Sequence, residues 1–181
     1  KPGVPIVDTR PSAAFTAGHV ATSINIQDGG KFETWLGAII NAGEKFYLLA
    51  ADEESLEKVI AKTAKIGYET NIISAQLVPP GADTRSPAFD ADDFEQRPQN
   101  YTIVDARNWT EINENKLFNH ALAIPLPELR ERLNEIPADK PIVVHCAAGY
   151  RSAAAASIIA AKIPYVPVYD LSTKVADFIN A

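Results

Sequence analysis

The sequence PIVVHCAAGYRSAAAASIIAAK, residues 141–162, joins the pattern of a strand to that of a helix. It begins with a short β-branched run that is typical of a buried strand, and it ends in an alanine-rich stretch that is typical of a helix. Cys146 stands where the strand should end, and a short loop separates it from a helix that we expect to begin near Ser152. Short apolar strands that alternate with helices predict a parallel sheet covered by helices on both faces.

The same order of elements occurs twice in the chain, which is the signature of an internal repeat. The segment VPIVDTR at 4–10 returns as YTIVDAR at 101–107, and the run KFYLLA at 45–50 has its counterpart in KPIVVHC at 140–146. Several such matches at a nearly constant spacing indicate two homologous α/β domains.

A proline-rich segment separates the two repeats. It reads VPPGADTRSPAF (78–89), with the prolines and glycine of a linker. We therefore predict an α/β domain at residues 1–79, a linker at 80–88 and a second domain at 89–181.

Charge and hydropathy exclude several classes of function. The formal net charge of the 181 residues is −6, and no stretch is rich in lysine or arginine. An acidic chain without a basic patch disfavours nucleic acid as a partner. No apolar run approaches the roughly 20 residues that a membrane-spanning helix needs. We expect a soluble, cytoplasmic protein that binds neither nucleic acid nor membranes.

The chain contains one cysteine, so the neighbours of Cys146 decide whether it is structural or reactive. Ligands of open α/β sheets bind at the carboxyl ends of the strands, which is where Cys146 stands. The backbone N–H groups of the following loop and the helix N-terminus favour an anionic sulfur there. Arg151 adds a positive charge, and Gly149 gives the loop the backbone freedom that a tight turn requires. These neighbours favour a reactive cysteine over a buried structural one.

Two motifs carry a resemblance to a known family. The loop CAAGYRS (146–152) resembles the active-site loop of rhodanese sulfurtransferases, and VDTRPSAAFTAGHVATSINI (7–26) is similar to the opening segment of that family. The resemblance covers nearly the whole chain, once per domain, and implies two rhodanese-like domains, each with a mostly parallel five-stranded sheet flanked by helices. It also implies that sulfane sulfur moves from thiosulfate or a low-molecular-weight persulfide to a thiol or another thiophilic acceptor. No cofactor and no metal are expected in this segment.

The resemblance assigns roles to individual residues. Cys146 would be the nucleophile that carries the persulfide, and Arg151 would help to hold the donor. Asp105 and Arg107 would support the loop from behind, although an Asp-x-Arg pattern at a strand end is equally consistent with a local ion pair. The remaining residues of the loop would bind substrate: Ala147, Ala148, Gly149, Tyr150 and Ser152.

The first repeat lacks this chemistry. Alignment of the strands places Ala50 at the position of Cys146, and the loop reads AADEES (50–55), with neither a thiol nor an arginine. The acidic side chains at 52–54 would repel an anionic donor. We predict that domain 1 is catalytically inactive.

Two alternative functions remain open. A cysteine phosphatase is suggested by His145-Cys146 followed by an arginine, but four residues separate Cys146 from Arg151, where the HC-x5-R motif has five. The shorter loop favours sulfur over phosphate, and His145 is then expected to be a strand residue with a hydrogen-bonded ring. The three histidines, which include His19 and His120, have no metal-ligand spacing. The other alternative is a scaffold whose two domains only support a partner domain.

Domain 1 indicates what that partner would be. The motifs KFETWLGAII (31–40) and AKIGYETNII (64–73) resemble the inactive first rhodanese unit of metallo-β-lactamase-fold proteins with a rhodanese tail, such as persulfide dioxygenases and glyoxalase-II-like hydrolases. The sequence starts at Lys1, and domain 1 has no lead-in comparable to 86–100. We therefore expect the native polypeptide to continue upstream into a covalently linked metallo-β-lactamase-fold domain.

Overall fold

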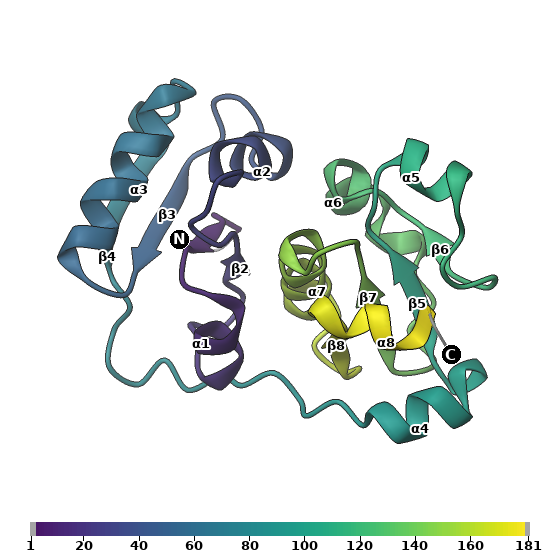
Figure 1. Cartoon of the computed structure of the whole chain (residues 1–181). Helices are drawn as coiled ribbons and strands as arrows, with labels where there is room; N and C mark the ends of the chain where they lie inside the picture. Colours follow the sequence, from purple (N-terminus) through teal and green to yellow (C-terminus); the bar gives the residue numbers. More distant parts are fainter. Residues whose placement is uncertain (1–2, 180–181) are drawn as a thin grey trace. The chain divides into compact units, whose positions relative to one another are not determined.

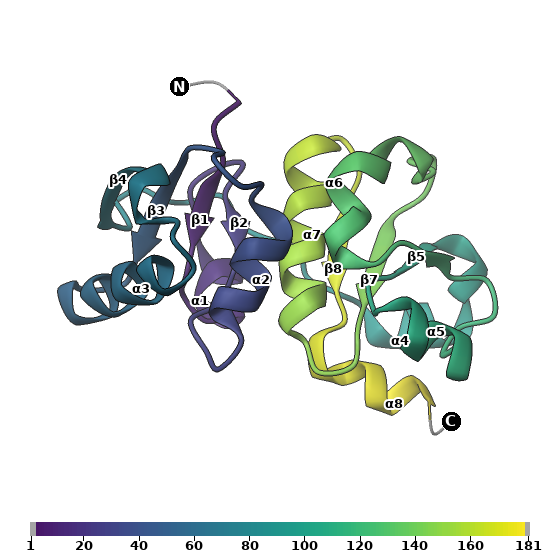
Figure 2. The ribbon, with the colours of Figure 1, turned by 90° about the horizontal axis from the view of Figure 1, so that it is seen from above.

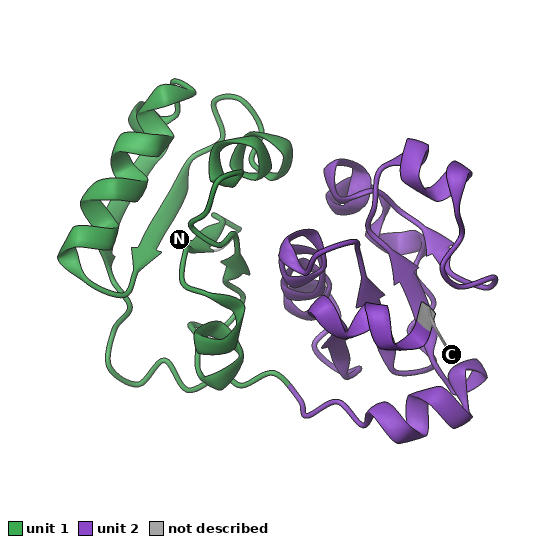
Figure 3. Ribbon diagram, viewed as in Figure 1, with its two compact units in different colours: residues 1–86 green, residues 87–181 purple. Residues whose placement is uncertain are grey.

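The computed structural model describes residues 3–179 and divides into two compact units. Figure 1 shows their helices and strands, and Figure 3 marks unit 1, residues 1–86, and unit 2, residues 87–181. The division falls inside the stretch 80–88, which the sequence indicated as a linker. Each unit has its own sheet and its own helices.

Both units are built on a parallel sheet with the same strand order. Unit 1 has the order β2-β1-β3-β4, with strands Ile24–Asn25, Ile6–Asp8, Phe46–Ala50 and Ile72–Leu77. Unit 2 has the order β6-β5-β7-β8, with strands Leu122–Ala123, Thr102–Asp105, Ile142–His145 and Val168–Asp170. Every pairing between named strands is parallel. The α/β class with parallel sheets flanked by helices is therefore confirmed.

Helices flank both sheets. Unit 1 contains α1 (Ser12–Ala17), α2 (Phe32–Ile39) and α3 (Glu53–Lys65). Unit 2 contains α4 (Ala91–Gln96), α5 (Trp109–Glu114), α6 (Leu129–Arg132), α7 (Tyr150–Lys162) and α8 (Val175–Ile179). Short 3-10 turns complete the chain: η1 (Glu69–Asn71), η2 (Pro98–Asn100), η3 (Leu126–Glu128), η4 (Leu133–Glu135) and η5 (Ser172–Lys174). No helix within residues 3–179 is long and apolar enough to cross a membrane.

The expected fifth strand is absent from both sheets of the described chain. Each repeat contains four short apolar runs, and each run forms one strand. In unit 2 the lead-in before β5 forms α4, because the Asp90 side chain accepts a hydrogen bond from the Asp93 amide at 3.0 Å and starts a helix there. Phe94 of α4 is buried in the core. A segment that forms a capped helix cannot extend the sheet, so the prediction of five strands is wrong.

The core of unit 2 holds β7 and α7 in fixed positions. Helices α6 and α7 lie on one face of the sheet, and α4 and α8 lie on the other (Figure 2). The alanines of the run 153–156 in α7 are all buried, which lets this helix pack closely on the sheet. On the opposite face Phe94 contacts Phe118 and Phe178 edge to face. The loop between β7 and α7 is thereby held between two packed elements.

Candidate active site

The thiol of Cys146 lies at the carboxyl end of β7 and is surrounded by polar groups. The side chain is 1 % exposed. Its sulfur accepts hydrogen bonds from the N–H of Gly149 at 3.2 Å and from the N–H of Ser152 at 3.3 Å. The Ser152 hydroxyl lies 3.4 Å from the same sulfur. These groups belong to the N-terminus of α7, which favours a negative charge on the sulfur.

The loop residues predicted to bind substrate divide into two groups. Gly149 and Ser152 contact the sulfur directly. Ala147 and Ala148 are exposed, and the Tyr150 side chain is 39 % exposed at the start of α7, two residues before the expected helix start. The inner residues therefore hold the sulfur, and the outer residues form the surface around it.

Gly149 is required at its position by both its backbone and its surroundings. Its φ of +89° lies in the left-handed region, where glycine has no steric penalty. A Cβ atom at this position would lie 2.7 Å from Oγ of Ser172 and 3.4 Å from its Cα. Ser172 itself has a φ of 48°. The turn that follows β8 thus fits closely against the loop that carries the thiol.

Arg151 is held by a carboxylate. Its Nη2 donates to Oε1 of Glu111 at 2.8 Å, and its Nη1 donates to Oε2 of the same side chain. The side chain of Arg151 is only 11 % exposed. The hydrogen bonds that Arg151 donates to Glu111 raise the pKa of Arg151, and the charge of Cys146 adds to this shift. The guanidinium of Arg151 is therefore fixed by Glu111.

Glu111 was not predicted from the sequence. This residue belongs to a capping box, because its Oε2 also accepts a hydrogen bond from the N–H of Asn108 at 3.1 Å. The hydrogen bonds from Arg151 are the main cause that lowers the pKa of Glu111 to about 2. The pattern Asn-x-x-Glu does predict a cap at the start of a helix. It does not reveal that an arginine 40 residues away lies opposite the carboxylate.

Asp105 and Arg107 form an ion pair with each other at the end of β5. Nε and Nη2 of Arg107 donate to the two carboxylate oxygens of Asp105, at 3.0 and 2.6 Å. Nη2 also donates to the carbonyl of Asn115 at 2.8 Å. The pair thus connects the end of β5 with the residue that follows α5. None of these bonds is to the loop of Cys146.

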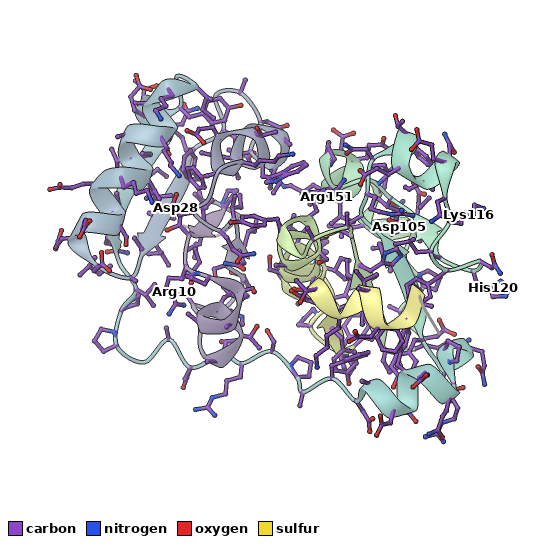
Figure 4. The ribbon with its side chains drawn as sticks, in the orientation of Figure 1. Arg10, Asp28, Asp105, Lys116, His120 and Arg151 are labelled. Carbon is purple, nitrogen blue, oxygen red and sulfur yellow. The ribbon has the colours of Figure 1, made fainter. Side chains whose placement is uncertain are left out.

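Unit 1 contains the same arrangement without a thiol. Nη2 of Arg10 donates to Oδ2 of Asp8 at 2.7 Å and to the carbonyl of Gly18 at 2.8 Å. Figure 4 labels Arg10 in unit 1 and Asp105 in unit 2. The same ion pair thus occurs beside a loop that has no nucleophile, so its role is structural. This favours the local ion pair over a direct role in the site.

His145 is fully buried, and its environment is not the one we expected. Neither ring nitrogen has a hydrogen-bond partner within the described residues. The ring packs against Phe118 at 4.9 Å between centroids, and its Nε2 lies 3.7 Å from Oδ2 of Asp105. That oxygen already accepts from Arg107. The prediction of a hydrogen-bonded ring is therefore wrong. Burial lowers the pKa of His145 to about 4, so the ring is neutral at neutral pH.

The other two histidines have different surroundings. His19 belongs to unit 1, where its ring stacks on Phe15 at 3.9 Å and its Nδ1 lies 2.8 Å from the carbonyl of the same residue. His120 is exposed in unit 2, and Figure 4 shows it and Lys116 well separated from Arg151.

A second residue that was not predicted from the sequence is Asp170, at the end of β8. Its Oδ1 accepts a hydrogen bond from the N–H of Ser172 at 2.8 Å. Burial raises the pKa of Asp170 to about 6, although the neighbouring Ser152 and Ser172 oppose the shift. Its place as the last residue of β8, at the carboxyl end of the strand, was the one available signal.

The strand registers identify the equivalent place in unit 1. Asp8 pairs with Leu49, as Asp105 pairs with His145, so Ala50 occupies the position of Cys146. Two residues separate Ala50 from α3, whereas three separate Cys146 from α7. The loop of unit 1 is therefore shorter.

A side chain of unit 1 itself caps the N-terminus of α3. Oδ1 of Asp52 accepts a hydrogen bond from the N–H of Ser55 at 2.8 Å. Ser55 is the third residue of α3, as Ser152 is the third residue of α7. The amide that binds the sulfur in unit 2 thus binds a carboxylate in unit 1.

Comparison with known proteins places residues 90–180 in the family model described as the Rhodanese-like domain. A rhodanese-related protein from Thermoplasma volcanium is 29 % identical, with 54 % of this chain and 92 % of that chain covered and a TM-score of 0.45. The 3-mercaptopyruvate sulfotransferase SseA from Escherichia coli is 17 % identical, with coverages of 94 % and 92 % and a TM-score of 0.38. A thiosulfate sulfurtransferase from Pseudomonas aeruginosa is 14 % identical, with coverages of 98 % and 36 % and a TM-score of 0.43. The comparison with curated proteins gave no match.

Proposed function

Because the chain belongs to the rhodanese-like family through residues 90–180, we propose that unit 2 is a sulfurtransferase that carries sulfane sulfur on Cys146. The observation that carries the proposal is the convergence of two backbone amides, those of Gly149 and Ser152, on the sulfur of a buried cysteine. Such donors stabilise a thiolate and the negative terminal sulfur of a persulfide. Thiosulfate and low-molecular-weight persulfides are the proposed donors.

The proposed reaction has two half-reactions. In the first, the Cys146 thiolate attacks the sulfane sulfur of the donor. A new S–S bond forms, the bond between the donor and its sulfane sulfur breaks, and the electron pair leaves with sulfite or with the donor thiolate. In the second, a thiolate or cyanide attacks the terminal sulfur, and the Cys146 thiolate leaves. Sulfur moves without an external oxidant or reductant, so this segment needs no cofactor.

The residues around the thiol would have different roles in this reaction. The amides of Gly149 and Ser152 hold the negative sulfur, and Arg151 supplies positive charge for an anionic donor while Glu111 fixes its guanidinium. The exposed Tyr150 would contact the part of the donor that leaves. Asp105 and Arg107 would contribute only by holding β5 and α5 together.

We assign unit 1 the second candidate function, that of an inactive rhodanese-like domain with a supporting role. The specific observation that favours this role is the Asp52 carboxylate on the helix amide that a sulfur would otherwise use. The identical strand order of the two sheets supports a tandem repeat.

The proposed partner of this unit is a covalently linked metallo-β-lactamase-fold domain, on the grounds of the motifs at 31–40 and 64–73. Linkage would raise the effective concentration of one site at the other. Sequencing the source gene upstream of Lys1 tests this partner. A start codon without an H-x-H-x-D-H segment would exclude it.

Intact-mass spectrometry tests the sulfurtransferase proposal directly. After incubation with thiosulfate or glutathione persulfide, the protein should gain the mass of one sulfur atom, and cyanide should remove that mass. Since Cys146 is the one cysteine of the chain, the site of any persulfide is unambiguous. Cys146→Ser should gain nothing. Failure of the wild-type protein to acquire sulfur from either donor would contradict the proposal.

A further inference from the structure

Arg151, the cation of the loop that carries the thiol, is paired with the carboxylate of Glu111. Its Nη2 donates to Oε1 of Glu111 at 2.8 Å, and its Nη1 donates to Oε2. The side chains of Arg151 and Glu111 are 11 % and 34 % exposed, so water screens this ion pair only in part. The pair as a whole has no net charge, because it contains one charge of each sign.

The backbone of Arg151 lies beside the sulfur. The N–H groups of Gly149 and Ser152 donate to Sγ of Cys146 at 3.2 and 3.3 Å, and Arg151 directly precedes Ser152 in the chain. From there the side chain of Arg151 extends to Glu111 in the first turn of α5. A donor that reaches the sulfur therefore meets a guanidinium whose charge is offset by a carboxylate.

Two further arginines that follow strands of this sheet are also paired with carboxylates. Arg107, after β5, lies 2.6 Å from the carboxylate of Asp105. Arg132, in the helix after β6, lies 2.7 Å from the carboxylate of Glu128. Lys174, after β8, is exposed, so salt and water screen its charge. These ion pairs leave this end of the sheet with little net positive charge.

The two proposed donors differ in the charge that they bring to the sulfur. Thiosulfate is a dianion, so three negative charges gather when the Cys146 thiolate attacks it, and sulfite leaves with two of them. A persulfide is attacked in its neutral form, R–S–SH, so its reacting group adds no charge to that of the thiolate. Positive charge near the sulfur therefore lowers the barrier much more for thiosulfate than for a persulfide.

We propose that Glu111 determines the donor specificity of Cys146, because its pairing with Arg151 disfavours thiosulfate and favours low-molecular-weight persulfides. With a persulfide, a bond forms between Sγ of Cys146 and the terminal sulfur, the donor S–S bond breaks, and its electron pair leaves with the thiolate R–S⁻. The proton stays on the transferred sulfur and is then lost to water. Glu111 is a positioning residue, since it acts through Arg151. The inference rests on the proposed function and narrows the class of donor.

Alkylation of Cys146 measures the charge preference of the site without any sulfur donor. Iodoacetate and iodoacetamide are similar in shape and differ by one negative charge, so the ratio of their rates reports the local charge. Glu111→Gln is nearly isosteric and releases the charge of Arg151, which should raise the ratio of iodoacetate to iodoacetamide about threefold. Arg151→Gln leaves the carboxylate without the guanidinium and should lower the ratio. The double variant has lost one charge of each sign and should return close to the wild-type ratio.

Sulfur loading, followed by intact mass, tests the donor itself. The persulfide of 2-mercaptoethanol is the neutral donor, and thiosulfate is the anionic one. Because thiosulfate carries twice the charge of iodoacetate, Glu111→Gln should raise the ratio of the thiosulfate rate to the persulfide rate by roughly tenfold. In 1 M potassium chloride, where the Debye length is about 3 Å, the differences between variants should shrink.

Glu114→Gln is the matched control, since it removes an exposed carboxylate from the same helix and should leave both ratios unchanged. Circular dichroism checks that each variant is folded, and Arg151→Gln still tests the proposal if Glu111→Gln is not. Ratios that are the same in wild type and in the folded single variants would overturn the inference. If neither donor loads the wild-type protein, the proposed function itself fails, and the alkylation ratios distinguish that outcome from a wrong assignment of Glu111.

Discussion

Glu111 binds the guanidinium of Arg151 through both of its carboxylate oxygens, and so connects the start of α5 to the first turn of α7. The same carboxylate caps α5 through the N–H of Asn108. One side chain therefore fixes a helix end and the charged residue beside the thiol. Glu111 contributes to stability in its ionised form.

Acid should remove that contribution. The pKa of Glu111 falls from 4.5 to about 2 on folding, so its stabilisation is present above pH 4.5 and is lost as the pH falls toward 2. Because the side chain is 34 % exposed, screening reduces the expected value to about 1–2 kcal/mol. Urea unfolding at pH 7 and pH 3 should show Glu111→Gln less stable than wild type at the higher pH, with a smaller difference at the lower pH.

Glu114→Gln is the control for this measurement, because it removes an exposed carboxylate from the same helix. It should change the free energy of unfolding by less than about 0.5 kcal/mol at either pH. A difference between Glu111→Gln and wild type that is equally large at both values of pH would contradict the ionic origin of the stabilisation.

The sequence predicted the sulfur site well where the contacts are local. Strand, loop and helix are contiguous in 141–162, and the amides of Gly149 and Ser152 that bind the sulfur lie within six residues of Cys146. A strand end followed by a tight turn and a helix dictates this geometry, because the helix N-terminus must face the strand end. The parallel sheets were predictable for the same reason, from short apolar runs that alternate with helices.

Contacts between distant segments were not predictable. Glu111 meets Arg151 across 40 residues only because α5 follows β5, α7 follows β7, and these two strands are paired in the sheet. Ser172 meets Gly149 because β8 pairs with β7 in a register that places Asp170 opposite Val144, so that the turn after β8 lies against the loop. The number of strands was overestimated because the resemblance implied five, while the chain itself supplies four apolar runs per unit.

Gly149→Ala should disrupt the loop and destabilise unit 2. A methyl group would lie 2.7 Å from Oγ of Ser172, at a backbone φ of +89°. Backbone strain and the displaced turn together should cost about 2–3 kcal/mol. Urea unfolding measures the loss, and slower alkylation of Cys146 should accompany it because the amide moves away from the sulfur.

Gly67→Ala measures the effect of backbone strain without a steric clash. Gly67 has a φ of +73°, but no atom lies within 4 Å of its added Cβ. This variant should lose only about 1 kcal/mol and leave alkylation of Cys146 unchanged. Equal losses of stability in Gly67→Ala and Gly149→Ala would show that the contact with Ser172 does not add to the destabilisation.

Aryl phosphates should not be substrates. The sulfur of Cys146 is enclosed by donors at 3.2 and 3.3 Å, and the four residues between it and Arg151 leave a smaller ring of amides than a phosphate needs. Hydrolysis of p-nitrophenyl phosphate should stay at the background measured for Cys146→Ser. Turnover that depends on Cys146 would favour a phosphatase over a sulfurtransferase.

A cysteine alone should not convert unit 1 into a second site. Ala50→Cys in a Cys146→Ser background puts a thiol at the equivalent strand end, but the shorter loop does not carry it to the helix amides in the same way. The Asp52 carboxylate already occupies the N–H of Ser55 and would repel an anionic donor. Intact-mass spectrometry with thiosulfate should show no added sulfur.

Removal of the Asp52 carboxylate tests its effect separately from the effect of the loop length. Asp52→Ala, added to Ala50→Cys, frees the amide of Ser55 at a cost of about 1 kcal/mol from the lost helix cap. Because the loop is still one residue short, the double variant should also acquire no persulfide. Replacement of the whole loop by the sequence CAAGYRS is the variant that should make the new thiol alkylate faster than Ala50→Cys. If Ala50→Cys by itself takes up sulfur, neither the loop length nor Asp52 explains why unit 1 is inactive.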